Sequence, residues 1–389
     1  MKFITGMNRD RDGYQVAGAL AEGGMLATLV TDYYAGATSL RIPALNHRQS
    51  ELVPPSAVRV VNRALISQLR HRALSRAGYS GRPAWHRIDS WIAEAIRDES
   101  KKRPSDGLLV YSNYAWKAFE SAPSSTFKGL FQYHPGASAV RAGLDVDELA
   151  TAAPWEDEPE LSLPERRRVY ELETTSADRI ICASSFTARG LALDGVGADR
   201  LRIVPYGCPK PPKSVDHDRS RMILFVGQGV QRKGLHILAA AWAKVKAPGW
   251  TLRIVSSRLD PQVRQALQAL DQGRVHVSGA VDATELENLY RRSSALVLPS
   301  LVEGFGLVLG EALSRGCRLI ASTNTGLPDL HLPSEVATTV PAGEIESLHS
   351  AIEAHIQDYE HGARATVLAV QCAADRSWSH FRKQIRAAL

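Results

Sequence analysis

Two carboxylates, Glu303 and Glu311, flank a short glycine-containing loop in the second half of the chain. An apolar run over 295–298 predicts a buried strand just before this loop. A helix is predicted from near Leu307 to Gly316, because glycine commonly follows the last turn of a helix. Glycines before a helix let the backbone approach an anion, and the free amides and dipole at a helix start favour negative charge. The segment therefore predicts a diphosphate-binding loop.

The positions of the two glutamates add chemical specificity. A helix rises about 1.5 Å per residue, so Glu311, more than one turn into the predicted helix, lies several ångströms behind the helix start. That offset suits the distance from a phosphate to an adjoining ribose. A carboxylate accepts hydrogen bonds and can take two hydroxyl donors. The pair therefore suits a molecule with hydroxyl groups on both sides of a diphosphate, as in a nucleotide sugar.

A second glycine loop carries two adjacent basic residues, Arg232 and Lys233. It lies between a predicted strand over 222–226 and a helix predicted over Lys233–Lys246. A cation at this point is a natural partner for a diphosphate. An ordinary helix start on the protein surface would explain the pair equally well from the residues alone.

Two positions in the first half could face the same ligand. His134 follows a predicted strand over 129–133, and Pro135-Gly136 predicts a sharp turn after it. Ligands of parallel sheets bind at the carboxyl ends of the strands, so we expect His134 to face a cleft. Gly13 lies before the helix predicted over 15–22, either as a flexible point of approach to a ligand or simply as a turn.

The segment from Ser300 to Glu311 resembles the E-x7-E signature of the family 4 retaining glycosyltransferases, which have the GT-B fold. The resemblance covers most of the second half of the chain and is weaker in the first half. It implies that Glu303 contacts hydroxyls of the donor sugar and that Glu311 contacts the ribose. It also implies that the donor phosphates are held by the amides of Gly304, Phe305, Gly306 and Leu307.

Other motifs resemble the same family, with some departures. Arg232 and Lys233 resemble its basic pair for the donor diphosphate, but Gln228 stands where the family often has an arginine, and whether Arg232 replaces that arginine stays open. His134 resembles a family histidine near the reacting carbon, although the family often has His-Asp and this chain has His-Pro. Gly13 lies where the family usually has paired glycines near the donor phosphate. By resemblance, His134 and Glu303 are the candidate catalytic residues.

Strands and helices alternate along both halves, which is typical of parallel sheets covered by helices. Strands are predicted over 3–4, 26–31, 108–111, 129–133, 179–183 and 201–204, and after a proline-rich linker over 222–226, 252–255, 275–277, 295–298 and 318–321. We therefore expect an α/β protein of GT-B type, with two Rossmann-like domains facing each other across a cleft. By resemblance to the GT-B fold, the expected units are an acceptor-side domain over 1–207, a nucleotide-sugar-binding domain over 208–374, and a C-terminal helix over 375–389 that crosses back to the first domain.

The composition, with 44% hydrophobic and 23% charged residues, is that of a globular protein, and no run approaches the roughly 20 apolar residues of a membrane span. The four cysteines form no CxxC pair and are expected to be reduced core residues of a cytoplasmic protein. Much of the positive charge lies between Arg59 and Arg103. This basic zone could contact an anionic membrane, or it could be a solvated helix surface. No nucleic-acid partner is expected, because no motif for one is present.

The resemblance implies a retaining glycosyltransferase of the hexosyltransferase class that uses no cofactor. Metal independence is expected because no Asp-x-Asp or other ligand cluster is seen. The acceptor would be a glycan, a lipid-linked molecule or a small molecule, in cell-surface polysaccharide or glycoconjugate biosynthesis. We expect the protein in the cytoplasm, or peripheral to the inner face of the membrane.

Three other classes of protein could share some of these sequence features. A GT-B sugar phosphorylase or epimerase and a non-catalytic nucleotide- or glycan-binding protein both stay open as alternatives. A nicotinamide-dependent dehydrogenase is disfavoured: Asp32 ends the second predicted strand, but the GxGxxG pattern that should precede it is absent.

Overall fold

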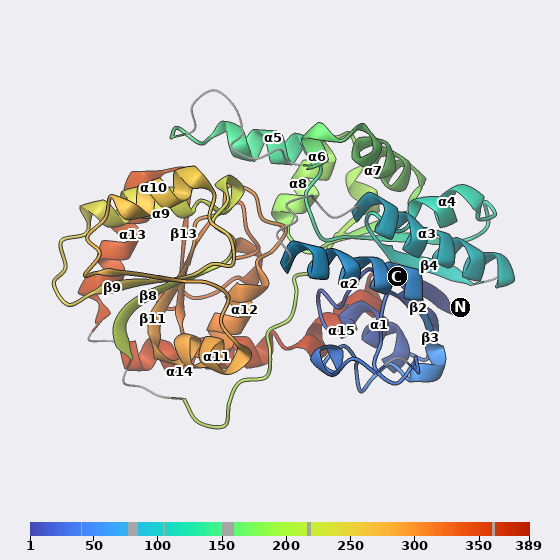
Figure 1. The fold of residues 1–389 in the computed structure, drawn as a ribbon, viewed down its shortest axis with the longest axis horizontal. Helices are drawn as coiled ribbons and strands as arrows, with labels where there is room; N and C mark the ends of the chain where they lie inside the picture. The colour runs from blue at the N-terminus through green and yellow to red at the C-terminus, as the bar shows by residue number, and fades with distance from the viewer. Residues whose placement is uncertain (40, 77–84, 104–105, 150–158, 216–218, 360–361) are drawn as a thin grey trace.

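In the computed structural model the chain forms two lobes, each built on a parallel sheet covered by helices (Figure 1). The structure describes residues 1–39, 41–76, 85–103, 106–149, 159–215, 219–359 and 362–389. The first lobe contains a seven-stranded sheet with the order β3-β2-β1-β4-β5-β6-β7. The second contains a six-stranded sheet with the order β10-β9-β8-β11-β12-β13. The strands of both sheets pair in parallel, so the predicted α/β architecture is confirmed.

The strands lie close to their predicted positions. Those of the first sheet are β1 (Phe3–Gly6), β2 (Leu26–Thr31), β3 (Val58–Val60), β4 (Gly107–Tyr111), β5 (Lys128–Gln132), β6 (Arg179–Cys182) and β7 (Leu201–Ile203). Those of the second are β8 (Ser220–Val226), β9 (Thr251–Val255), β10 (Val275–Ser278), β11 (Ser293–Leu298), β12 (Arg318–Ser322) and β13 (Ala337–Val340). Two short edge strands, β3 and β13, were not predicted.

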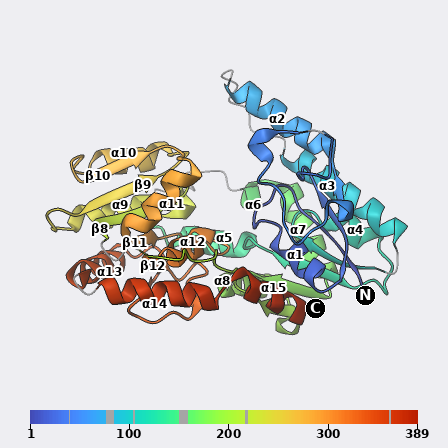
Figure 2. The same cartoon turned by 90° about the horizontal axis from the view of Figure 1, so that it is seen from below.

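The helices pack on both faces of the two sheets (Figures 1 and 2). The first lobe has α1 (Gln15–Glu22), α2 (Asn62–Arg76), α3 (Trp85–Lys102), α4 (Trp116–Ser121), α5 (Ala137–Asp145), α6 (Pro159–Ser162), α7 (Pro164–Ser176) and α8 (Ser185–Leu193). The second has α9 (Leu235–Lys244), α10 (Pro261–Gln268), α11 (Ala283–Arg292), α12 (Leu307–Ser314), α13 (Ile345–Gln357) and α14 (Gly362–Asp375), and α15 (Trp378–Ala387) ends the chain. Among the described residues, no helix has the length and apolarity that a membrane crossing requires.

The helix predicted from Lys233 to Lys246 needs a correction. Residues Gln231–Lys233 form a short 3-10 turn, and the α-helix starts only at Leu235. The reason is Gly234, which has a left-handed backbone with φ of 67° and so separates the two helical segments. Lys233 therefore lies in a turn that precedes the helix.

The last helix, α15, lies against α1 of the first lobe (Figure 2). Arg382 donates a hydrogen bond to the side chain of Gln15 (2.7 Å), and Arg386 pairs with Glu22 (2.8 Å). At the far end, Arg179 of β6 donates to the carbonyl oxygen of Ala388 (2.9 Å). The end of the chain is thus attached to the first lobe, while α14 before it packs on α12 of the second. All four cysteines are buried and unpaired, as expected.

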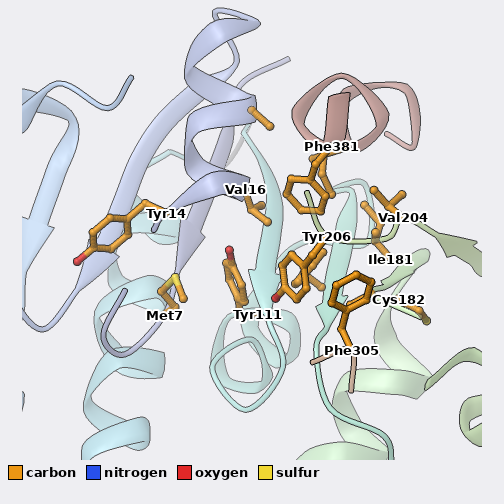
Figure 3. Close-up of a cluster of buried hydrophobic side chains, with 14 of the residues drawn as sticks. Met7, Tyr14, Val16, Tyr111, Ile181, Cys182, Val204, Tyr206, Phe305 and Phe381 are labelled. Atoms are coloured by element: carbon orange, nitrogen blue, oxygen red, sulfur yellow. The ribbon is translucent and has the colours of Figure 1, made fainter. Parts of the chain in front are cut away.

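An aromatic cluster joins the two lobes near the end of β7 (Figure 3). Tyr206, which is only 4% exposed, lies at its centre. Its ring centroid is 5.6 Å from that of Phe131 in β5, 5.5 Å from Phe305 in the second lobe and 5.4 Å from Phe381 in α15. Burial of such rings is a large apolar contribution to stability. The cluster therefore holds the β11–α12 loop, through Phe305, against the first lobe.

The hydroxyl of Tyr206 gives a stability prediction. It is buried and has no hydrogen-bond partner among the described residues. A buried polar group without a partner costs about 1–3 kcal/mol, so Tyr206→Phe should raise the free energy of unfolding by about 1 kcal/mol. Tyr290→Phe is the matched control, because the Tyr290 hydroxyl is bonded to Glu311 and its loss should destabilise the protein. Chemical denaturation measures both variants; destabilisation by Tyr206→Phe would show that its hydroxyl is satisfied.

Candidate functional site

The β11–α12 loop has the geometry of an anion-binding loop. Strand β11 ends at Leu298, and α12 begins at Leu307 directly after Gly306, whose φ of 91° is left-handed. A side chain at Gly306 would also lie only 2.6 Å from Leu298. The amide of Leu309 donates to the carbonyl oxygen of Gly306 (2.9 Å). The amides of Leu307 and Val308, at the very start of α12, are of the kind that have no partner within a helix, and the helix dipole adds positive character there. The predicted strand, loop and helix are confirmed, and Gly316, with φ of 82°, follows the last turn of the helix as expected.

Glu303 and Lys233 form an ion pair between the two predicted donor-binding loops. Both side chains are largely buried, with 14% and 17% exposure. Burial acts to raise the pKa of Glu303, but the charges of Lys233 and Arg232 lower it below its ordinary value. Glu303 is therefore an ionised acceptor held beside an ammonium group.

Backbone hydrogen bonds hold the two loops together. The carbonyl oxygen of Arg232 accepts from the amides of Leu301 (2.8 Å) and Val302 (3.1 Å). Gly234 approaches so closely that a side chain there would overlap the carbonyl oxygen of Pro299. This close packing fixes Lys233 relative to Glu303, and it explains why glycine is required at position 234.

Glu311 lies on α12, where the spacing placed it, and is held by a residue that the spacing did not reveal. The hydroxyl of Tyr290 in α11 donates a hydrogen bond to Oε2 of Glu311 (2.7 Å). Tyr290 itself is 3% exposed. Its bond orients the carboxylate and leaves Oε1 to accept from a ligand. The spacing of the apolar residues in α11 could have indicated that Tyr290 is buried, but not which residue its hydroxyl contacts.

The β11–α12 loop packs directly against the first lobe. A side chain at Gly304 would overlap the carbonyl oxygen of Tyr133 and would lie 3.3 Å from Cα of His134. The carbonyl oxygen of Gly304 accepts from the hydroxyls of Ser184 (2.6 Å) and Thr187 (3.3 Å). Ser184 is also the N-cap of α8, so a capping pattern in the sequence could have found it, but its partner in the other lobe could not be seen.

His134 lies beside the β11–α12 loop, close to Gly304. Its charge, if protonated, acts on Glu303 and favours the ionised form of that carboxylate. Nδ1 is 2.9 Å from the carbonyl oxygen of Pro135. A carbonyl oxygen only accepts hydrogen bonds, so this contact places the proton of the neutral ring on Nδ1. In the neutral ring Nε2 is then the acceptor atom. The structure therefore brings His134 together with Glu303 and Lys233.

Gly13 lies between β1 and α1 with a left-handed φ of 64°. A side chain there would have space, since the nearest atom outside its neighbours is 3.8 Å away on Gln15. Backbone conformation, rather than close packing, therefore explains this glycine. Asp12 beside it is buried and accepts from the hydroxyl of Tyr111 (2.5 Å). Burial raises the pKa of Asp12 above its ordinary value, although that hydrogen bond opposes the change.

A second set of buried hydrogen bonds joins the two lobes, next to the loop that carries Arg232 and Lys233. Helix α5 reaches over the second lobe (Figure 1), and the carboxylate of Asp147 just after it meets Gln231 (2.9 Å) and His236 (3.0 Å). Burial acts to raise the pKa of Asp147, but His236 and Gln231 hold it below the ordinary value. Gly143 of α5 allows this approach, because a side chain there would lie 2.5 Å from the carbonyl oxygen of Leu301. Sequence reasoning did not identify Asp147.

The basic zone is partly paired within the first lobe. Arg59 pairs with Glu99 (2.8 Å) and Arg63 with Glu94 (2.6 Å). Arg82 lies outside the described residues, as do the side chains of Arg72 and Arg76. The paired arginines contribute less net charge to the surface than the sequence count suggested.

Asp32, the acidic residue that a dehydrogenase would direct at a ribose, is fully buried. Arg48 donates to its Oδ2 (2.9 Å) and the amide of Arg9 donates to its Oδ1 (2.8 Å). Its oxygens are engaged inside the first lobe, which agrees with the exclusion of a dehydrogenase from the sequence.

Comparisons with known proteins bear on this site. Residues 210–366 match the family model described as "Glycosyl transferases group 1". A glycogen synthase of Mycobacterium tuberculosis is 28% identical over 209 residues, which span 49% of this chain and 49% of that protein. A D-inositol 3-phosphate glycosyltransferase of Nocardia farcinica is 26% identical over 315 residues, 75% of this chain and 68% of the relative. The chain thus spans about half the length of the glycogen synthase that it matches.

The fold is also that of known structures. The sucrose-phosphate synthase of Thermosynechococcus elongatus superposes with a TM-score of 0.70 at 19% identity, covering 100% of this chain and 98% of that one. Two facing Rossmann-like domains of this kind define a GT-B protein, as predicted. Within that fold, the segment that matches the group 1 glycosyl transferase model, residues 210–366, carries Arg232, Lys233, Glu303 and Glu311.

Proposed function

We propose that this protein transfers a hexose-type sugar from a nucleoside-diphosphate sugar to a hydroxyl group of an acceptor, with retention of anomeric configuration. The observation that carries the proposal is the meeting of Glu303, Lys233 and the N-terminal end of α12. An acceptor for sugar hydroxyls, a cation and free helix amides lie together there, and Glu311 lies further along the same helix. A nucleotide sugar has the complementary groups in the same order.

In the proposed reaction, the bond from sugar C1 to the diphosphate breaks while a bond from C1 to the acceptor oxygen forms on the same face. The departing diphosphate oxygen takes the proton of the acceptor hydroxyl. Lys233, Arg232 and the amides of α12 would stabilise the negative charge that develops on the diphosphate. As Lys233 turns to the diphosphate, Glu303 would be released to orient the sugar. Nε2 of His134 would accept a hydrogen bond from a hydroxyl group of the sugar.

We further propose that transfer requires no metal ion, because Lys233, Arg232 and the helix amides supply positive charge at the leaving group. Activity in excess EDTA should equal activity in added Mg²⁺ or Mn²⁺. An assay of nucleoside diphosphate release under the three conditions measures this. Loss of activity in EDTA that a divalent ion restores would contradict this part of the proposal.

The acceptor is proposed to be a glycan, a lipid-linked molecule or a small molecule of glycoconjugate biosynthesis, bound by the first lobe from the cytoplasmic side. The basic zone lies on the same lobe, so contact with an anionic membrane is part of the proposal. Sedimentation with phosphatidylglycerol vesicles should carry the protein down at low salt and release it at high salt. No binding at low salt would exclude the membrane contact without affecting the transferase.

A panel of nucleotide sugars tests the proposed function. One donor should give free nucleoside diphosphate and a glycoside whose anomeric configuration, measured by NMR, matches that of the donor. Conversion of the sugar nucleotide without release of nucleotide would indicate an epimerase. A requirement for inorganic phosphate as co-substrate would indicate a phosphorylase. Nucleotide binding without any turnover would favour a non-catalytic binding protein.

A further inference from the structure

Arg11 is a cation of the first lobe that the proposed reaction does not use. It lies in the loop between β1 and α1, two residues before Gly13. Its guanidinium carbon is 4.1 Å from the centre of the Tyr133 ring, which is a stacking distance. The residue is nevertheless exposed to solvent. The hydrogen-bond donors of a guanidinium group lie at the edge of its planar fork, where a ligand can reach them while the carbon stays over the ring.

The charge of Arg11 is not balanced by a nearby carboxylate in the part of the chain that the structure describes. No Asp or Glu oxygen there lies within 4.0 Å of its guanidinium nitrogens. Two other arginines of this lobe do have such partners: Arg48 pairs with Asp32, and Arg166 pairs with Asp89. The adjacent carboxylate, Asp12, instead meets Tyr111 and the amide at the start of α1. Arg11 therefore differs from Arg48 and Arg166 in being exposed without a carboxylate partner in the described part of the chain.

The position of Arg11 relates it to the donor site. It stacks on Tyr133, whose carbonyl oxygen contacts Gly304 of the β11–α12 loop, and His134 follows directly. The diphosphate groups of the donor have their own cations, Arg232 and Lys233, on the second lobe. A ligand group that reaches Arg11 comes from the side of the first lobe, on which the acceptor is proposed to bind.

We infer that Arg11 binds an anionic group, a phosphate or a carboxylate, of the acceptor. The planar fork of arginine can donate two parallel hydrogen bonds to either group, and charge-assisted bonds of this kind are about twice as strong as neutral ones. The inference rests on the proposed function, since it assigns a class of acceptor to the transferase. It predicts that neutral sugars are poor acceptors and that negatively charged ones are preferred.

Calorimetric titration of three probes tests the inference: glucose 6-phosphate, glucuronate and glucose, each added to protein saturated with the nucleoside diphosphate that binds best. At least one anionic probe should bind about tenfold or more tightly than glucose, as expected for a charged hydrogen bond. Arg11→Gln should abolish that preference, and Arg11→Lys should restore part of it. Arg141→Gln, at an exposed position of α5, is the control and should bind like the wild type. The two anionic probes distinguish a phosphate from a carboxylate.

Binding of neither anionic probe would overturn the inference. Equal binding of the anionic probes and glucose, or an unchanged preference in Arg11→Gln, would also overturn it. Weaker binding of the nucleoside diphosphate itself in Arg11→Gln would assign Arg11 to the donor and would overturn it as well. Failure of every nucleoside diphosphate to bind the wild type is a separate result, because it contradicts the proposed function and not the anion preference of Arg11, which the same probes measure without nucleotide.

Discussion

Lys233→Gln should lower kcat/KM for sugar transfer by roughly 100-fold to 1,000-fold, which is the usual effect of removing one group that stabilises charge in a transition state. In the resting protein Lys233 is paired with Glu303, so the variant also leaves a buried carboxylate without its cation. Burial raises the pKa of Glu303, and Lys233 opposes that effect in the wild type. The acidic limb of the pH–rate profile should therefore move to higher pH in Lys233→Gln.

The measurement is steady-state release of nucleoside diphosphate over a range of pH. Glu303→Gln should also lose most of its activity, since the amide lacks the negative charge and has an NH2 donor in place of one of the two acceptor oxygens. Lys244→Gln is the matched control: this lysine lies at the opposite end of α9 from the loop and pairs on the surface with Glu346, so activity should not change. Full activity in either Lys233→Gln or Glu303→Gln would remove the basis of the site assignment.

Gly304→Ala should destabilise the protein and strongly reduce transfer, because the added methyl group would overlap the backbone carbonyl of Tyr133. Backbone cannot rotate away as a flexible side chain can, so the loop and the first lobe must separate. Overpacking of this kind costs about 1–3 kcal/mol. The same shift would move Glu303, which precedes Gly304, away from His134 and would weaken the hydrogen bond from Ser184 to the loop.

Chemical denaturation and the transfer assay together test this expectation. Gly279→Ala is the control in the same lobe, since no atom lies within 4 Å of a side chain added there, and its stability should stay within about 0.5 kcal/mol of the wild type. If Gly304→Ala were as stable and as active as Gly279→Ala, the lobes would not meet at this loop as described.

The parts of the site that could be predicted from the sequence are those with local causes. The apolar run of β11, the glycine before α12 and the glycine after it lie within one continuous segment, and each has a direct backbone meaning. The two edge strands were missed because β3 and β13 are short and only partly buried, so they lack the apolar run that marks a central strand.

The residues that could not be predicted depend on contacts between distant parts of the chain. Ser184 and Gly304 are separated by 120 positions, and Asp147 and His236 by 89. Such pairs leave no local pattern, because each residue has an unremarkable position on its own element. The pairing of Lys233 with Glu303 was missed for the same reason, although each residue was identified separately. Ser184 meets Gly304, and Asp147 meets His236, only where the two lobes pack together, whereas Lys233 and Glu303 come together within the second lobe.

The central claim is that the β11–α12 loop and Lys233 bind a nucleoside diphosphate. Calorimetric titration of UDP, GDP, ADP and dTDP into the wild type, Lys233→Gln and Glu311→Gln measures it most directly. One nucleotide should bind the wild type, and each variant should bind it about tenfold or more weakly, as expected when a charged hydrogen-bonding group is removed. Absence of binding by all four nucleotides, or equal binding to the wild type and both variants, would contradict the claim.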